Sequence, residues 1–168
     1  MTGNLAKTKY LIIGAGPAAA NAAEAIRKSD TGGKLTIITD EKIPFYSRPL
    51  ITHILSENTG RDGHHDKILY RDDAWIKKNK ITLITPCKAT DIDTSKKIVR
   101  TTATPHPAIK YDKLLIASGG EPILPPFLKS SVGKAKIFTL TTIENAYEIK
   151  SAIKKLSDLK HTNKSKND

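Results

Sequence analysis

The chain has 168 residues, of which 38% are hydrophobic, and it carries a formal net charge of +11. This length is enough for one domain with its own core, and the low hydrophobic content predicts exposed or uncovered surface. No apolar run approaches the roughly 18 residues of a transmembrane helix. The single cysteine, Cys87, excludes an intrachain disulfide, a CxxC redox pair and a cysteine zinc site.

The N-terminal residues lack the apolar core of a signal peptide, and together with the cysteine usage this predicts a cytoplasmic protein. The positive charge raises the question of nucleic-acid binding. However, the lysines are spread along the chain, without an arginine-rich stretch or a basic patch interleaved with aromatic residues. The charge therefore favours a solvated lysine surface over a nucleic-acid site.

The first predicted elements are a buried strand at residues 9–13, a glycine turn, and a helix from Pro17 to about Ser29. Gly14 permits the tight turn, Gly16 lets the backbone approach a phosphate, and the small Ala19 lets the helix pack close to the strand. The helix start directs its free N–H groups at an anion. This pattern predicts a dinucleotide pyrophosphate site formed by Gly14, Ala15, Gly16, Pro17, Ala18 and Ala19. The alternative is a glycine turn that binds no ligand.

The second predicted strand, residues 34–39, is followed directly by Asp40 and Glu41. An acid at the end of this strand is typical of dinucleotide folds, where it binds a ribose hydroxyl. Both residues are candidates, and the alternative is that both are solvent-exposed turn residues. No arginine follows directly, which makes a phosphorylated ribose the less favoured ligand.

The middle of the chain predicts a short helix from Pro49 to Leu55, a polar loop, a helix over residues 68–80 and a strand over 81–84. Adjacent histidines in the loop, His64 and His65 with Asp66, favour a solvated loop over a metal site, because no further ligand is evident. Trp75 is predicted to pack in the core, and no metal-binding residue is assigned.

Short strands over residues 87–92, 97–101 and 108–111 predict a small antiparallel meander, in which Cys87 is a buried or half-buried thiol. A further strand over 113–117 exits through a glycine pair. The proline-rich segment 121–126 is followed by residues 136–140 and by a helix over 143–156, which Thr142 caps. We therefore expect one α/β domain over residues 1–157 and a polar, disordered tail over 158–168.

Three segments together resemble a known family: IIGAGPAAANAAEAIRK, TIITDEKIPFYSRPLI and YDKLLIASGGEP. They resemble the N-terminal, FAD-binding part of the pyridine nucleotide-disulfide oxidoreductase superfamily. The branch they are most similar to contains the rubredoxin reductases, the NADH oxidases and the flavoprotein segment of nitrite reductases. The resemblance implies a Rossmann-like FAD/NAD(P)-binding fold with FAD as cofactor. It covers nearly all of this chain but only about the first third of a family member.

The resemblance also implies roles for individual residues. The glycine turn would hold the FAD pyrophosphate, and Asp40 or Glu41 the adenosine ribose. Further contacts with FAD would come from Ser47, Arg48 and Pro49 beside the flavin, from the main chain of Lys88 and Ala89 at the adenine, and from Ala117, Ser118 and Gly119 in a closing loop. His53 stands where relatives often have lysine, so it is either a flavin contact or an ordinary helix-face histidine. No catalytic residue is assigned, because the flavin carries the chemistry.

By resemblance, the chain is the FAD-binding portion of an enzyme that passes electrons from NAD(P)H through FAD to an external acceptor such as rubredoxin or ferredoxin. The NAD(P)H-binding domain is expected in another part of a longer chain or in a partner, and an oligomer is compatible with the sequence. Two other functions remain open. One is a non-redox module that binds FAD or ADP, and the other is a basic nucleic-acid-binding protein on a Rossmann-like scaffold.

Overall fold

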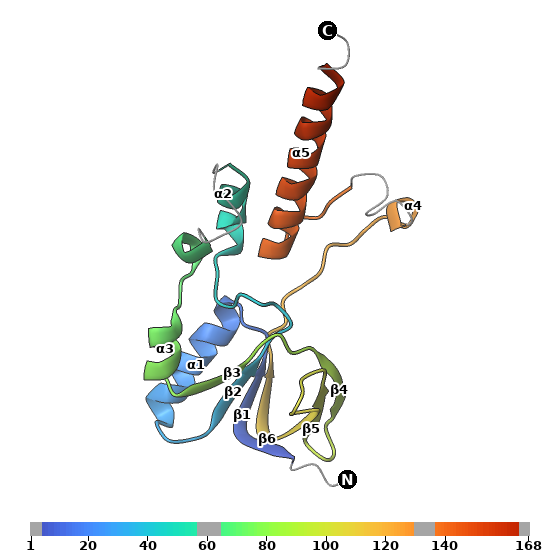
Figure 1. The fold of residues 1–168 in the computed structure, drawn as a ribbon. Helices are drawn as coiled ribbons and strands as arrows, with labels where there is room; N and C mark the ends of the chain where they lie inside the picture. Colours follow the sequence, from blue (N-terminus) through green and yellow to red (C-terminus); the bar gives the residue numbers. More distant parts are fainter. Residues whose placement is uncertain (1–4, 57–64, 130–136, 165–168) are drawn as a thin grey trace. The chain divides into compact units, whose positions relative to one another are not determined.

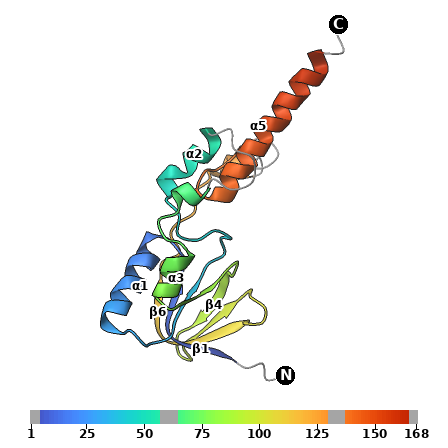
Figure 2. The same ribbon diagram turned by 60° about the vertical axis from the view of Figure 1, so that its left-hand side comes forward.

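The computed structural model of the chain describes residues 5–56, 65–129 and 137–164. The chain divides into two compact units, which are described separately. Unit 1 comprises Met1–Tyr46 and Leu69–Gly119, and unit 2 comprises Ser47–Ile68 and Gly120–Asp168. Figures 1 and 2 show the elements of both units from two directions. Among the helices in the described residues, none is both long and apolar enough to cross a membrane.

Unit 1 is built on a six-stranded sheet with the strand order β3-β2-β1-β6-β5-β4. Strands β3, β2, β1 and β6 are parallel, and β6, β5 and β4 form an antiparallel meander. The strands are β1 (Ala6–Ile13), β2 (Leu35–Ile38), β3 (Ile81–Ile84), β4 (Ala89–Asp93), β5 (Ile98–Thr101) and β6 (Ala108–Ile116). The predicted α/β fold, a Rossmann-like parallel sheet with a small meander, is confirmed.

One apolar cluster lies on the face of the sheet that is covered by α1 (Pro17–Ser29) and α3 (Asp73–Lys78) (Figure 1). Three buried alanines of α1 let the helix approach the strands closely, and Trp75 of α3 packs edge-on against Phe45 at 5.2 Å between ring centroids. The buried members of this cluster are Ile12, Ala19, Ala20, Ala23, Leu35, Ile37, Phe45 and Ile81. The core role predicted for Trp75 is confirmed.

A second cluster lies on the other face, where the meander covers the sheet. Neighbouring residues of one strand point to opposite faces, so Leu11 and Ile38 belong here while Ile12 and Ile37 belong to the first cluster. The other buried members are Cys87, Val99, Ile109 and Tyr111. Cys87 is a buried free thiol, as the sequence predicted.

Two regions of unit 1 differ in extent from the sequence prediction. The strands expected over 108–111 and 113–117 are one continuous strand, β6, whose register with β1 is the same on both sides of the exposed Asp112. The helix expected over 68–80 is only α3, Asp73–Lys78. It begins late because the Asp72 side chain accepts a hydrogen bond from the Trp75 N–H and caps the first turn, and it ends before Lys80, whose φ is 48°.

Unit 2 contains η1 (Arg48–Leu50), α2 (Ile51–Ser56), η2 (His65–Ile68), α4 (Pro126–Lys129) and α5 (Ile143–Lys164). Helices α2 and α5 pack together, and Lys150 Nζ donates to the Ile54 carbonyl at 3.2 Å. Thr142 caps α5 as predicted, because its Oγ1 accepts from the Asn145 N–H at 3.2 Å. Asn145 Oδ1 in turn accepts from the Thr142 N–H at 3.2 Å, which completes a capping box.

Unit 2 also departs from the sequence prediction at its last helix. Helix α5 runs past the predicted end at residue 156 and includes residues 158–164, which the sequence had assigned to a disordered tail. Lysine and leucine are good helix formers, and extending an existing helix costs less than starting one.

Candidate nucleotide-binding site

Three loops of unit 1 follow the carboxyl ends of adjacent parallel strands. Ile13 pairs with Ile38 on one side and with Ile116 on the other, so the ends of β2, β1 and β6 lie at the same edge of the sheet. The chain turns from β1 to one neighbour through α1, while β6 lies on the opposite side of β1. Such a reversal of strand order is where open α/β sheets bind ligands. The edge therefore brings together the loops that begin at Gly14, Thr39 and Ala117.

The first of these loops depends on Gly14. Its φ is +103°, a region that side chains rarely adopt, and its N–H donates to the Ile38 carbonyl at 2.8 Å. A Cβ at Gly14 would lie 2.2 Å from the Ala117 carbonyl oxygen. The loops after β1 and β6 therefore lie in direct contact, and only glycine fits at this contact.

The start of α1 is open in the way an anion site requires. Gly16 is the N-cap, it offers no side-chain cap, and the first turn contains no acidic residue. A Cβ built at Gly16 would meet nothing within 4 Å, so the space above the turn is free of protein atoms of the described chain. Pro17 and Ala18 are exposed, whereas Ala19 is fully buried against the sheet. The unpaired N–H groups and the positive end of the helix dipole thus face open space.

The two acids after β2 have different surroundings. Asp40 is exposed, and its carboxylate makes no hydrogen bond or ion pair with any residue that the structure describes. Glu41 is half-buried, and its carboxylate accepts a hydrogen bond from the Tyr46 hydroxyl. The Glu41 carbonyl accepts a further bond from the Thr85 hydroxyl. No signal in the sequence pointed to Tyr46 or Thr85 as partners of this turn.

The remaining predicted contacts of unit 1 lie at the same edge or beside it. Ser118 and Gly119 are exposed in the loop after β6, and Gly119 has a φ of +73°. Lys88 lies outside the sheet just before Ala89 opens β4. The Lys88 N–H already donates to Thr102 Oγ1 at 2.9 Å. An adenine contact through this amide would therefore have to replace the bond to Thr102.

Ser47, Arg48 and Pro49 belong to unit 2. The Ser47 N–H donates to the Ile68 carbonyl at 2.8 Å, and Arg48 Nη1 donates to the Thr141 carbonyl. His53 is an exposed residue of α2. The side chains of the polar loop with His64, His65 and Asp66 lie outside the described residues. In the rest of the chain, no group of three or more possible metal ligands comes together.

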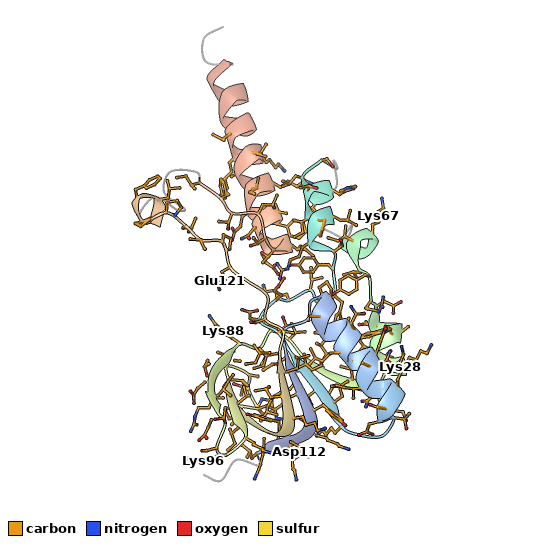
Figure 3. All side chains as sticks on the ribbon, turned by 180° about the vertical axis from the view of Figure 1, so that it is seen from behind. Lys28, Lys67, Lys88, Lys96, Asp112 and Glu121 are labelled. Atoms are coloured by element: carbon orange, nitrogen blue, oxygen red, sulfur yellow. The ribbon has the colours of Figure 1, made fainter. Side chains whose placement is uncertain are left out.

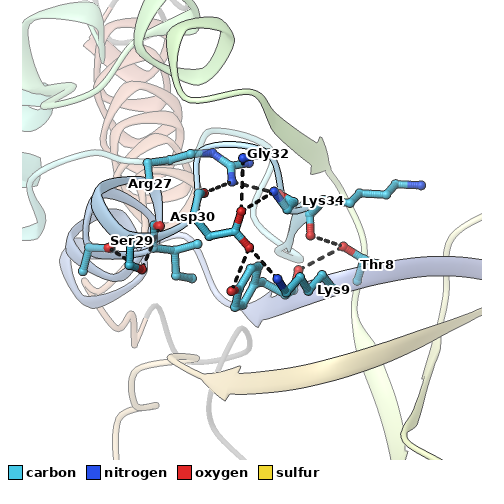
Figure 4. A network of polar contacts seen from close by, with 11 residues as sticks. Thr8, Lys9, Arg27, Ser29, Asp30, Gly32 and Lys34 are labelled. Atoms are coloured by element: carbon cyan, nitrogen blue, oxygen red, sulfur yellow. Dashed lines mark hydrogen bonds and ion pairs between the residues drawn. The ribbon is translucent and has the colours of Figure 1, made fainter.

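A polar network at the opposite, amino-terminal edge of the sheet was missed from the sequence (Figure 4). The Asp30 carboxylate accepts bonds from Lys9 Nζ at 2.7 Å, the Gly33 N–H at 2.7 Å and the Tyr10 hydroxyl at 3.0 Å. These bonds hold the pKa of Asp30 well below its usual range, and the bond from Lys9 has the largest effect. Asp30 in turn raises the pKa of Lys9. The network fixes the end of α1, so its role is structural.

Arg27 completes this support. Its guanidinium donates to the carbonyls of Asn79 at 2.5 Å, Gly33 at 2.8 Å and Lys80 at 3.0 Å. A single planar fork thereby joins the last turn of α1 to the turns before β2 and β3. Because α1 is held at this end, its open N-terminus keeps a fixed position at the other edge of the sheet.

Three lysines of unit 1 lie on separate elements. Figure 3 shows Lys28, Lys88 and Lys96 on different parts of unit 1: α1, the segment before β4, and the β4–β5 turn. Lys96 also pairs with Asp93 at 3.4 Å. The solvated lysine surface, favoured over a nucleic-acid site, stays a prediction from the sequence.

Comparison with known proteins agrees with this geometry. The family described as pyridine nucleotide-disulphide oxidoreductase matches residues 8–163. The NADH-rubredoxin oxidoreductase of Clostridium acetobutylicum is 38% identical over 154 residues, which are 88% of this chain and 36% of the relative. The NADH-dependent phenylglyoxylate dehydrogenase subunit epsilon of Aromatoleum evansii is 31% identical over 151 residues, 87% of this chain and 33% of that protein. The chain therefore belongs to the pyridine nucleotide-disulphide oxidoreductase family.

Solved structures place the same fold in larger proteins. The crystal structure of the NADH:rubredoxin oxidoreductase from Clostridium acetobutylicum matches with a TM-score of 0.67 and 34% identity, over 89% of this chain and 36% of that one. A NAD-dependent persulfide reductase from A. fulgidus matches with a TM-score of 0.71 and 27% identity, over 88% and 27%. The chain thus spans about a third of the length of the curated relatives described above.

Proposed function

We propose that this chain is the FAD-binding portion of an NAD(P)H-dependent flavin oxidoreductase that passes electrons to an external acceptor. The observation that carries the proposal is the uncapped start of α1 at Gly16, which faces open space at the carboxyl edge of a Rossmann-like sheet. Membership of an oxidoreductase family supports it. When bound, FAD supplies the hydride and electron chemistry, and the protein supplies binding and orientation.

In this proposal the residues of unit 1 bind the adenosine half of FAD. The turn from Gly14 to Ala19 holds the pyrophosphate through backbone N–H groups, and an acid after β2 holds the ribose. The further contacts remain those predicted from the sequence: Ser47, Arg48, Pro49, Lys88, Ala89, Ala117, Ser118 and Gly119. Of these, the Lys88 amide has least support, because Thr102 already accepts its hydrogen bond.

In this proposal, NAD(P)H binding and the acceptance of electrons belong to another domain or to other proteins. We expect residues 1–157 to act as one FAD-binding domain and the NAD(P)H-binding part to come from another domain or chain. A rubredoxin or a ferredoxin is the expected class of acceptor, by analogy with the relative named NADH-rubredoxin oxidoreductase. The cytoplasmic location remains a prediction.

The binding part of the proposal is tested by titrating FAD and ADP into Gly16→Val, with Gly32→Val as the matched control. Both glycines have open space where the new Cβ would lie, so we expect both variants to fold, which circular dichroism checks. Gly16→Val fills the room that the phosphates need, and we expect at least a tenfold loss of affinity. Gly32→Val, in the turn after α1, is expected to bind as the wild type does. Equal affinity in a folded Gly16→Val variant would refute this site.

The redox part is tested by following NADH oxidation with FAD and an artificial acceptor. We expect no useful turnover by the 168 residues alone, and activity when a chain with the NAD(P)H-binding part is added. Rapid turnover by this chain alone would contradict the expectation. If the chain bound ADP but not FAD, a non-redox adenine-nucleotide module would be favoured instead.

A further inference from the structure

Phe45 has a backbone conformation that is unusual for a buried aromatic residue. Its φ is 57°, in the left-handed region that favours glycine, and only 1% of its surface is exposed. Among the described residues other than glycine, φ is also positive at Lys80 and Lys97, but both are exposed and lie in turns. A bulky residue keeps this conformation only where the surrounding structure imposes it, and such strain is concentrated at functional sites.

The contacts of Phe45 hold it in this conformation. Its carbonyl accepts a hydrogen bond from the Tyr70 N–H at 2.9 Å. Its ring packs edge-on against the rings of Tyr70 and Trp75, at 6.4 Å and 5.2 Å between ring centroids. The ring therefore anchors the residue in the core of unit 1, and the Phe45 N–H points in a fixed direction.

The Phe45 N–H contacts the turn that is predicted to bind phosphate. It donates to the Ala15 carbonyl at 3.0 Å, and the Tyr70 hydroxyl lies 3.5 Å from the same oxygen. The Ala15 carbonyl and the Gly16 N–H belong to one trans peptide group. In a planar trans peptide the C=O and the N–H point in opposite directions. A carbonyl held toward Phe45 therefore turns the Gly16 N–H away from the protein.

The Gly16 N–H has no other group to direct it. It makes no hydrogen bond within the part of the chain that the structure describes, and a Cβ at Gly16 would meet nothing within 4 Å. We propose that Phe45 is a positioning residue, whose anchored backbone directs the Gly16 N–H at the pyrophosphate of the bound nucleotide. This inference rests on the proposed function, because it concerns the same nucleotide site.

The test removes the Phe45 N–H and leaves the ring in place. Incorporation of phenyllactic acid at position 45 turns the amide into an ester. The matched control is 4-hydroxyphenyllactic acid at position 111, because Tyr111 is also a buried aromatic residue whose N–H donates to a carbonyl, that of Lys97, at 3.0 Å. Both esters should lower the thermal midpoint by similar amounts, because each loses one backbone hydrogen bond.

The readout is the ratio of the affinities of the 168-residue chain for ADP and for adenosine, which lacks the phosphates. We expect the wild type to prefer ADP by at least about tenfold, the scale of a charge-assisted hydrogen bond. The Phe45 ester should lower this preference severalfold and reduce the NMR shift of the Gly16 amide proton on ADP binding. The Tyr111 ester should change neither.

An unchanged preference in the Phe45 ester would overturn the inference, as would an equal loss of preference in both esters. The first result would show that the direction of the Gly16 N–H does not depend on Phe45, and the second that any lost backbone bond weakens the site. A wild type without a preference for ADP would refute the proposed phosphate site, and this inference with it.

Two ordinary substitutions separate the hydrogen bond from its anchor. Phe45→Leu keeps the N–H and an apolar side chain in the core, so it should retain most of the preference for ADP. Phe45→Gly keeps the N–H and adopts a positive φ without strain, but it has no side chain to hold the backbone, so the preference should fall severalfold. Circular dichroism checks the fold of both variants. A full preference in folded Phe45→Gly would overturn the role of the ring as an anchor.

Discussion

The two units of the chain bury their apolar residues to very different degrees. In unit 1, Leu11, Ile12 and Ile37 are at most 1% exposed. In unit 2, Ile123, Phe127 and Ile153 are 97%, 76% and 59% exposed. Unit 1 therefore carries its own two-sided core and exposes Ile116 (60%) at the end of β6, whereas unit 2 exposes apolar side chains before α4, on α4 and on α5. Exposed apolar surface marks places where further protein is expected to pack or where copies associate.

The difference in burial between the units predicts where substitutions affect folding and where they affect association. The candidate site of unit 1 stands on a buried sheet, and its loops are tied to one another by backbone bonds. The buried apolar residues of unit 2 in the described chain are fewer: Ile51, Ile54, Ile68, Ile143 and Ala146. We therefore expect substitutions in unit 1 to act mainly on folding and those on the exposed face of unit 2 to act mainly on association.

The largest expected effect is on the core of unit 1. Ile37→Ala removes a fully buried side chain and should lower the free energy of unfolding by about 2–5 kcal/mol. Ile153→Ala removes the same atoms from an exposed helix position and should change it by less than about 0.5 kcal/mol. Urea unfolding of both variants measures the contrast, and equal losses would show that the two units do not differ.

The next effect concerns two glycines with positive φ. Gly14→Ala adds backbone strain and a clash with the Ala117 carbonyl, and should cost about 2–4 kcal/mol. Gly119→Ala adds the strain without a clash, because its Cβ would meet nothing within 4 Å, and should cost about 1–2 kcal/mol. Thermal and urea unfolding distinguish the two. If the cost at Gly119 were as large as that at Gly14, the clash with the Ala117 carbonyl would add nothing to the cost at Gly14.

A third prediction addresses the exposed surface of unit 2. The double variant Phe127→Ser, Ile153→Ser should reduce self-association of the chain without lowering its unfolding midpoint. Sedimentation velocity at several protein concentrations gives the measurement. Lys154→Ser, at an exposed polar position of α5, is the control. Association that is unchanged in the double variant would place the contact elsewhere.

The smallest effect is the pH dependence contributed by Asp30. Its pKa is lower in the folded chain than the ordinary 3.8, so its contribution to stability is present above that pH and is lost as the pH falls further. Asp30→Asn should therefore reduce the difference in stability between about pH 5 and about pH 3. Asp93, whose pKa the bonds from Ser95 and Lys96 lower to about 2, is the comparison site on the meander. A pH dependence unaltered in Asp30→Asn would contradict the assignment.

The sequence by itself determined the elements that depend on local preferences. The glycine turn and the helix Pro17–Ser29, the strand Ile81–Ile84 and the Thr142 cap are present as predicted. In each, the signal lies in neighbouring residues: an apolar run before glycine, a proline at the first turn, or a threonine before a helix. The family motifs added the place of the candidate site, because they mark the same turn.

Only the tertiary structure decided the features that join distant segments. The placement of β6 beside β1, about a hundred residues apart in sequence, brings the Ala117 loop against Gly14. The engagement of the Lys88 amide depends on Thr102, and the difference between Asp40 and Glu41 depends on Tyr46 and Thr85. Two adjacent acids look alike in sequence because their local preferences are similar. The surrounding segments made them different, because an acid accepts a hydrogen bond only where the folded chain places a donor beside it.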